Sequence, residues 1–294
     1  MLGEKGAAVV RAFCEHLPDP EGTLAVVIGR DAAVTDDHGD AIRAAAERAG
    51  VTHSSQRAAA QRALPPPDVV VAAGWRHLIY TTAQLIVLHD SPLPRYRGFA
   101  PLVNMLINGE PELAATALYA VRDYDAGDVI ATRTAPVAYP LRIAEAITLV
   151  ARLYYELAAD LAGRLLAAGG QRLPATPQDH AAATYSIWRD REDYRLDLAL
   201  DAERLARTVD ALGYPYAHAR LRLDGTEVAV RAAEALPHIR HEVPAVGKVM
   251  FATPDSCTVA CGAGALRITE AQYLAGPRAG ASIFPLEGFR KRFA

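Results

Sequence analysis

Two continuous apolar runs, "DVVVAAG" at residues 68–74 and "AQLIVLH" at 83–89, constrain the fold of this chain most. A strand without polar alternation is typical of a parallel sheet that is covered on both faces. The shorter apolar run "LAVVIG" (24–29) precedes them, and the segment after it carries apolar residues at helical spacing. Strands that alternate with helices predict an α/β domain, with a Rossmann-like, mostly parallel sheet and helices on both faces.

A second, smaller domain is expected after residue 183. A stripe of apolar residues predicts one long helix over 143–168, which the pair Gly169-Gly170 ends. Beyond it, Asp224-Gly225 stands between two alternating runs, which is a hairpin signal, and three short apolar strands follow. We therefore predict one domain over 1–183 and a small β-rich, OB-like domain over 184–294.

Composition limits the classes of partner. The 294 residues carry 31 Lys+Arg against 34 Asp+Glu, a net charge of −3, so we expect no nucleic-acid partner. No apolar run reaches the length of a membrane span, no signal peptide precedes the first helix, and the three cysteines form no disulfide pattern. No His, Cys, Asp or Glu grouping has metal-ligand spacing. The sequence thus predicts a cytoplasmic protein without a metal site or a membrane contact.

The segment "LHDSPLPRYRG" (88–98) places His89 at the carboxyl end of a predicted strand, where α/β sheets bind ligands. Two prolines stiffen the loop that follows, and Arg95 and Arg97 add permanent cations suited to a carboxylate or a phosphate. A histidine that only fills a polar niche, beside a salt-bridged turn, is the alternative interpretation.

Asp125, in "DYDAGDVI", precedes an Ala-Gly turn that lets its carboxylate point back to the end of the sheet. A carboxylate aimed at an imidazole raises the basicity of the ring and fixes its tautomer. The alternative is an ordinary turn that contains an aspartate.

Together and in this order, "VLHDSPLP", "RYRGFAP", "INGE" and "DAGDVI" resemble the signature of the folate-dependent formyltransferase superfamily. The resemblance extends through "TYSIWRDREDYRLDL" and "LGYPYAHARLRLDG", which are similar to the start of that family's C-terminal module, so it covers nearly the whole chain. It implies a catalytic domain, a C-terminal formyltransferase-like domain, 10-formyltetrahydrofolate as cosubstrate and, through the C-terminal domain, a homodimer.

The resemblance implies that His89 and Asp125 are catalytic. A primary amine would attack the formyl carbon, and His89 would stabilise the tetrahedral oxyanion or move the amine proton, with Asp125 accepting charge. The positions that the resemblance assigns to folate binding are Trp75, Arg76, Ile79, Val121, Tyr124 and Asp125.

The chain departs from the family pattern at three places, one of which is "AAT" (114–116), where the family usually has Gly-Val-Thr. Val87 stands where the family has a catalytic Asn, and losing one oxyanion donor typically costs about a hundred- to a thousand-fold in rate. Three interpretations stay open: another group donates to the oxyanion, the reaction is slow, or the protein is a non-catalytic relative that binds folate. Only Met1 and Leu2 precede the first helix, whereas a strand takes about five residues, so we expect a truncated first strand or a late start.

The segment "TYSIWRDREDYRLD" is most similar to the sugar N-formyltransferases, which implies a nucleotide-linked amino sugar as the acceptor. An aromatic residue could stack on a base or sugar face, and an arginine could meet a pyrophosphate. An equally weighted alternative is that Trp188 anchors a linker; a non-sugar amine such as a hydroxylated ornithine also stays open. The positions assigned to the acceptor are Ser91, Arg95, Arg97, Asn104, Tyr185, Trp188 and Arg189.

Overall fold

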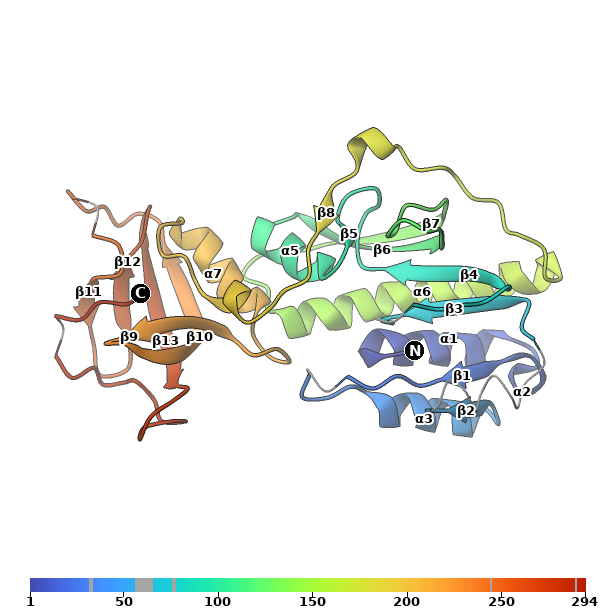
Figure 1. The fold of residues 1–294 in the computed structure, drawn as a ribbon, viewed down its shortest axis with the longest axis horizontal. Coiled ribbons are helices and arrows are strands. Elements are labelled where there is room, and N and C mark those ends of the chain that lie inside the picture. Colours follow the sequence, from blue (N-terminus) through green and yellow to red (C-terminus); the bar gives the residue numbers. More distant parts are fainter. Residues whose placement is uncertain (32–33, 56–65, 76–77, 244, 289) are drawn as a thin grey trace. The chain divides into compact units, whose positions relative to one another are not determined.

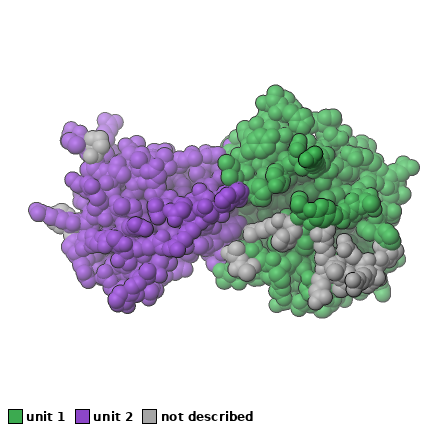
Figure 2. Space-filling model, in the orientation of Figure 1, with its two compact units in different colours: residues 1–102, 111–137, 145–187 green, residues 103–110, 138–144, 188–294 purple. Residues whose placement is uncertain are grey.

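A computed structural model describes residues 1–31, 34–55, 66–75, 78–243, 245–288 and 290–294. The chain divides into two compact units, coloured green and purple in Figure 2. Unit 1 comprises residues 1–102, 111–137 and 145–187; unit 2 comprises 103–110, 138–144 and 188–294. The fold class predicted from the sequence, an α/β part followed by a β-rich part, is confirmed.

The central sheet of unit 1 has the strand order β3-β4-β6-β7 (Figure 1). Its strands are β3 (Val69–Ala73), β4 (Gln84–His89), β6 (Glu112–Tyr119) and β7 (Val129–Pro136). The apolar runs that predict parallel strands form β3 and β4, which pair in parallel from Val69↔Gln84 to Ala73↔Leu88. The next two strands join antiparallel: β6 runs opposite to β4, with His89 opposite Thr116, and β7 runs opposite to β6.

A second, two-stranded parallel sheet joins β1 (Ala25–Val27) to β2 (Thr52–Ser54). Met1 and Leu2 connect it to the central sheet by hydrogen bonds: Gly29 N donates to Met1 O at 2.8 Å, and Leu2 N donates to Ala73 O at 3.1 Å. Helices α1 (Gly3–His16) and α3 (Gly39–Arg48) pack over these strands through a core of Val10, Val26, Ile28, Ile42, Ala45, Ala46 and Val51.

The long helix α6 (Ile143–Ala168) has the bounds predicted from its apolar stripe. Val150, Leu153, Leu157 and Leu161 of that stripe are buried, and both glycines after the helix have positive φ. Within unit 1, α6 lies beside α1, since Tyr155 Oη donates to Glu15 Oε2 at 2.5 Å. The hydroxyl oxygen of Tyr154, on the same helix, lies 2.8 Å from Leu88 O, so α6 contacts the end of β4.

Unit 2 contains a five-stranded antiparallel sheet in the order β11-β12-β13-β10-β9. The predicted hairpin is present: Asp224 and Gly225 both have positive φ, as a type I′ turn requires. Helix α7 begins after Asp201, whose carboxylate accepts from Arg204 N at 2.8 Å, and it packs on β10. The elements are α7 (Ala202–Ala211), β9 (Ala219–Leu223), β10 (Thr226–Leu236), β11 (Val249–Ala252), β12 (Cys257–Ala260) and β13 (Ala265–Tyr273).

The remaining elements are short, apart from α5. They are α2 (Pro20–Thr23), β5 (Arg97–Gly98), α5 (Pro101–Asn108), η1 (His180–Ala182), β8 (Tyr185–Ser186) and η2 (Glu192–Tyr194). Strands β5 and β8 pair in parallel, Arg97 with Tyr185 and Gly98 with Ser186. This pairing binds the segment that follows β4 to residues 185–186, near the last residues of unit 1. Across the described parts of the chain, no helix is both long enough and apolar enough to cross a membrane.

Candidate functional site

His89 is the last residue of β4, and 7% of its surface is exposed. Its Nε2 lies 2.8 Å from the backbone oxygen of Tyr96, in the loop that returns from the strand. Its Nδ1 lies 3.5 Å from Asp125 Oδ2. The histidine and the aspartate that the sequence singles out are therefore brought together at the end of the sheet.

The loop between β6 and β7 places Asp125 beside the imidazole. Asp125 has φ of 50°, and its Oδ2 accepts from the backbone N–H of Gly98 at 2.8 Å. A Cβ on Gly127 would lie 1.8 Å from the Tyr119 carbonyl oxygen, so only glycine allows the loop to fold back this tightly. In the "DAG" sequence, Asp125 thus supplies the carboxylate, and Gly127 allows the tight turn that directs it toward His89.

The backbone of the loop after β4 fixes the His89 tautomer. A carbonyl oxygen only accepts hydrogen bonds, so Nε2 carries the hydrogen that Tyr96 O binds, and Nδ1 of the neutral ring keeps its lone pair. This differs from the expectation that Asp125 sets the tautomer. The carboxylate instead stands where Nδ1 would receive a proton, and it would pair with the imidazolium that results.

A second carboxylate, Asp90, follows His89 in the chain but has other partners. Its Oδ2 pairs with Lys5 Nζ of α1, and its Oδ1 accepts from Tyr154 Oη of α6. Burial by itself raises the pKa of this carboxyl, but the Lys5 ammonium and the hydrogen bonds outweigh it, so the pKa of Asp90 lies below its usual value. Burial and the neighbouring Asp90 charge raise the pKa of Tyr154.

The three polar residues predicted to bind the acceptor in the loop after β4 differ in exposure. Arg95 is exposed, with its guanidinium 5.1 Å from the Tyr96 ring centroid. Ser91 is fully buried and donates to Arg95 O at 2.8 Å, so its hydroxyl holds the loop. Arg97 is 2% exposed and bonds to Gln178 and His180 rather than facing solvent.

Val87 and His89 are alternate residues of β4, so their side chains project to the same face of the sheet, with Leu85 next along that face. Leu85, Ile79 and Val121 line a cavity of about 330 Å³, to which Tyr119 and Arg172 also contribute. Two of the residues predicted to bind folate, Ile79 and Val121, are therefore on one cavity wall. Trp75 is half-buried and packs near Gly29, while Arg76 lies outside the described residues.

Exposed aromatic residues flank the site in unit 1. Tyr124 packs edge-to-face on Phe99, with ring centroids 5.3 Å apart, and both are exposed. Tyr185 is 67% exposed on β8. Trp188, at 60% exposed, belongs to unit 2.

Asn104 and Arg189, both predicted to bind the acceptor, meet each other within unit 2. A guanidinium nitrogen of Arg189 donates to the side-chain oxygen of Asn104. Each side chain therefore fixes the position of the other. Their binding of the acceptor stays a prediction.

Sequence reasoning missed Gln178, which is buried and donates from Nε2 to Asp125 O and Gly127 O, at 2.7 Å each. It also missed Lys5 and the Gly98 amide. None of them carries a local signal, because each meets its partner through pairing of segments far apart in the chain. Among the described residues, no group of three or more His, Cys, Asp or Glu could hold a metal ion.

Comparison with known proteins identifies two family domains in the chain. The model described as "Formyl transferase" matches residues 26–148, and the model described as "Formyl transferase, C-terminal domain" matches residues 189–285. The methionyl-tRNA formyltransferase of Ralstonia nicotianae is 34% identical over 225 residues, which is 74% of this chain and 67% of that protein. The methionyl-tRNA formyltransferase of Janthinobacterium sp. is 34% identical over 244 residues, 78% of this chain and 73% of that protein.

Solved structures share the fold at lower identity. HypX from Aquifex aeolicus, in complex with tetrahydrofolic acid, superposes with a TM-score of 0.52 and 23% identity over 71% of this chain. The match covers 36% of HypX, so this chain spans about a third of that protein. WlaRD, a sugar 3N-formyl transferase in the presence of dTDP and 5-N-formyl-THF, has a TM-score of 0.58 and 12% identity over 91% of this chain and 94% of its own. The two domain matches and the 34% identity over most of the chain show that it belongs to the formyl transferase family.

Proposed function

We propose that this protein transfers a formyl group from 10-formyltetrahydrofolate to the primary amine of a nucleotide-linked amino sugar. The observation that carries the proposal is the contact between His89 Nδ1 and Asp125 Oδ2 at the end of β4. Residues 1–183 form the catalytic domain in this account, and residues 184–294 form the C-terminal domain.

His89 moves the proton in the reaction. The amine nitrogen forms a bond to the formyl carbon, and Nδ1 takes the proton that the nitrogen loses, with Asp125 pairing the imidazolium. The bond between the formyl carbon and N10 of the folate then breaks, and N10 takes that proton. The Nε2–H bond to Tyr96 O holds the ring in place through both steps.

Val87 leaves the formyl oxygen without a side-chain donor from the neighbouring position on the same face of β4. Among the β4 side chains on this face, only His89 can carry an N–H, and in this account its Nδ1–H pairs with Asp125 and then passes to N10. We therefore expect slow turnover rather than none, because losing one oxyanion donor typically costs about a hundred- to a thousand-fold.

The cavity beside the start of β4 supports folate as the donor. Its walls combine apolar side chains, among them Leu85 and Val121, with the polar Gln84 and Arg172, which suits a flat ring system with polar edges. Leu85, which lines this cavity, and His89 are four residues apart on β4, about 13 Å along the strand, which is a distance that an extended folate could span.

Charge and exposed rings favour a small nucleotide-linked acceptor. Residues 188–294 contain 15 Lys+Arg and 14 Asp+Glu, so the C-terminal part has a net charge of only +1, which is little for binding a nucleic-acid backbone. Tyr185 of unit 1 exposes most of its ring, which suits stacking on a base or a sugar face. Arg95 is the exposed cation of the loop after β4 and would meet a pyrophosphate.

Methionyl-tRNA is the second candidate acceptor, because the relatives at 34% identity are named for it. It differs from the first candidate in what the protein must recognise beyond the reacting amine: an acceptor stem with many phosphates rather than one diphosphate. Binding of the stem would fall steeply with salt, whereas binding of a nucleotide sugar would not.

The test is tetrahydrofolate release by the purified protein with 10-formyltetrahydrofolate and a panel of UDP-, dTDP- and GDP-linked amino sugars, with methionyl-tRNA as a separate arm. Release with one sugar establishes the reaction and its acceptor. Release with methionyl-tRNA alone overturns the sugar proposal but keeps formyl transfer. Folate binding without release in any arm overturns both.

A further inference from the structure

Gln178 joins two loops of unit 1 through all the hydrogen-bonding atoms of its side-chain amide. Its Nε2 donates to Asp125 O and to Gly127 O, both at 2.7 Å. Its Oε1 accepts from Arg97 Nη2 at 2.7 Å and from Arg97 Nε at 3.1 Å. The amide is thus saturated between the loop that carries Asp125 and the strand β5, with 8% of the residue exposed.

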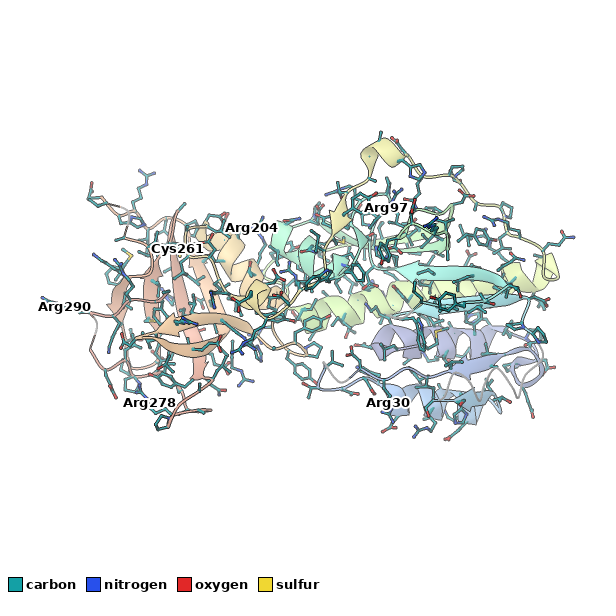
Figure 3. All side chains as sticks on the ribbon, in the orientation of Figure 1. Arg30, Arg97, Arg204, Cys261, Arg278 and Arg290 are labelled. Atoms are coloured by element: carbon teal, nitrogen blue, oxygen red, sulfur yellow. The ribbon has the colours of Figure 1, made fainter. Side chains whose placement is uncertain are left out.

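Arg97 is one of the largest fully buried side chains of the described structure, and Figure 3 labels it in unit 1. The side chains that its guanidinium contacts there carry no negative charge: they are the Gln178 oxygen and His180 Nδ1, the latter at 3.3 Å. Burying a charge is expensive unless its donors are satisfied. The buried guanidinium therefore needs the Gln178 oxygen as an acceptor. Because Oε1 points to Arg97, Nε2 of the same amide points to the loop that carries Asp125.

The same pair acts on Asp125 at two points, through the residue that follows Arg97 and through the Asp125 backbone. Arg97 precedes Gly98, whose N–H donates to Asp125 Oδ2 at 2.8 Å, and Gln178 holds the Asp125 backbone oxygen. Arg97 thus acts on the carboxylate through β5, and Gln178 acts on its backbone through the amide. Neither side chain contacts His89 in the described structure.

We propose that Arg97 and Gln178 form a positioning pair that holds Asp125 against His89, so Arg97 serves the reaction from inside the protein rather than as an acceptor ligand. This inference rests on the proposed function for its kinetic effect, but its structural effect is independent of any substrate. Asp125 has φ of 50°, outside the conformations that most residues prefer, so the loop needs such external bonds to stay as it is.

The kinetic test compares Gln178→Ala and Gln178→Glu with the wild type. Both variants lack the Nε2 donors, whereas Gln178→Glu keeps the size of the side chain and an acceptor for Arg97. We expect kcat to fall by about ten- to a hundred-fold in both, with KM for the folate and the amine changed little, because a misplaced group costs rate rather than binding. A wild-type kcat in Gln178→Glu would overturn the proposal, since it would reduce Gln178 to a partner of Arg97.

A double variant tests whether the two residues act as one unit. Arg97→Met combined with Gln178→Ala should lose no more rate than the more damaging single change. Losses that multiply would overturn the pairing. The matched control is Gln272→Ala, because Gln272 Oε1 also accepts from an arginine at 2.7 Å, that of Arg231, on the exposed sheet of unit 2.

A substrate-free measurement separates this proposal from the proposed function. Hydrogen exchange of the Gly98 amide reports whether Asp125 Oδ2 stays on that N–H. We expect faster exchange in Gln178→Ala and Gln178→Glu, and no change in Gln272→Ala or in Ile42→Val, a core variant of unit 1 that tests the effect of lost stability alone. Unchanged exchange in folded Gln178→Glu overturns the positioning pair, whether or not formyl transfer is observed.

Discussion

Two aspartates flank His89, and the structure treats them differently. Asp90 lies among Lys5 of α1 and Tyr154 of α6, and its pKa is low because the ammonium and the hydrogen bonds outweigh its burial. Asp125 lies on a loop, accepts one backbone N–H and faces the imidazole at 3.5 Å. The Asp90 carboxylate binds side chains of α1 and α6 at the end of β4. The Asp125 carboxylate instead faces Nδ1 of His89, the atom that would take a proton.

The largest expected effect is that of Asp125→Asn. The amide keeps the shape of the side chain and an acceptor for Gly98 but cannot pair an imidazolium, so we expect kcat to fall about a thousand-fold. The free energy of unfolding should change little. Steady-state kinetics and urea unfolding check the two parts, and a variant with nearly wild-type kcat would remove Asp125 from the catalytic group.

The converse is expected of Asp90→Asn. Removing the charge leaves the Lys5 ammonium, which is 19% exposed, without its partner, and we expect a loss of about 3 kcal/mol in the free energy of unfolding. The kcat of the folded protein should stay within a few-fold of the wild type. If kcat fell as far as in Asp125→Asn while stability held, the division between the two carboxylates would be wrong.

Val87→Asn tests whether the face of β4 that carries His89 lacks a donor for the oxyanion. An asparagine there would add an N–H donor beside His89, and we expect kcat to rise by about ten- to a hundred-fold. Val87→Leu, which adds volume without a donor, is the control. No gain with asparagine would mean that another group already binds the oxyanion.

The smallest expected effect is on the pH dependence of stability. A carboxyl whose folded pKa is depressed contributes stability that is present above its unfolded pKa of about 3.9 and is lost as pH falls through the folded value. Asp90→Asn should therefore lose less stability than the wild type between pH 5 and pH 3. Urea unfolding at the two pH values measures the difference, and equal losses would show that Asp90 does not titrate as described.

Local patterns predicted the elements whose signals are confined to one segment. The α6 stripe and its two terminal glycines gave the bounds 143–168, and Asp224-Gly225 gave the hairpin, because period and turn chemistry act within a few residues. The closeness of His89 and Asp125 was also predicted, from the end of a strand and an Asp-Ala-Gly turn.

Local sequence patterns did not predict the contacts of Arg97 and Lys5. Arg97 was predicted to be a ligand because Arg95 and Arg97 place two cations shortly after His89, but the pairing of β5 with β8 buries Arg97 against Gln178, 81 residues away. Lys5 meets Asp90 across 85 residues, and Tyr96 O binds His89 only once the loop after β4 has folded back. Such contacts depend on the assembled fold, and no window of the sequence contains both partners.

The most direct test of the account is His89→Ala. Binding of 10-formyltetrahydrofolate and release of tetrahydrofolate would be measured for the wild type and the variant, with nucleotide-linked amino sugars as acceptors. The account predicts that the variant binds the folate within a few-fold of the wild type and releases no tetrahydrofolate above background. Release at the wild-type rate by His89→Ala would contradict it.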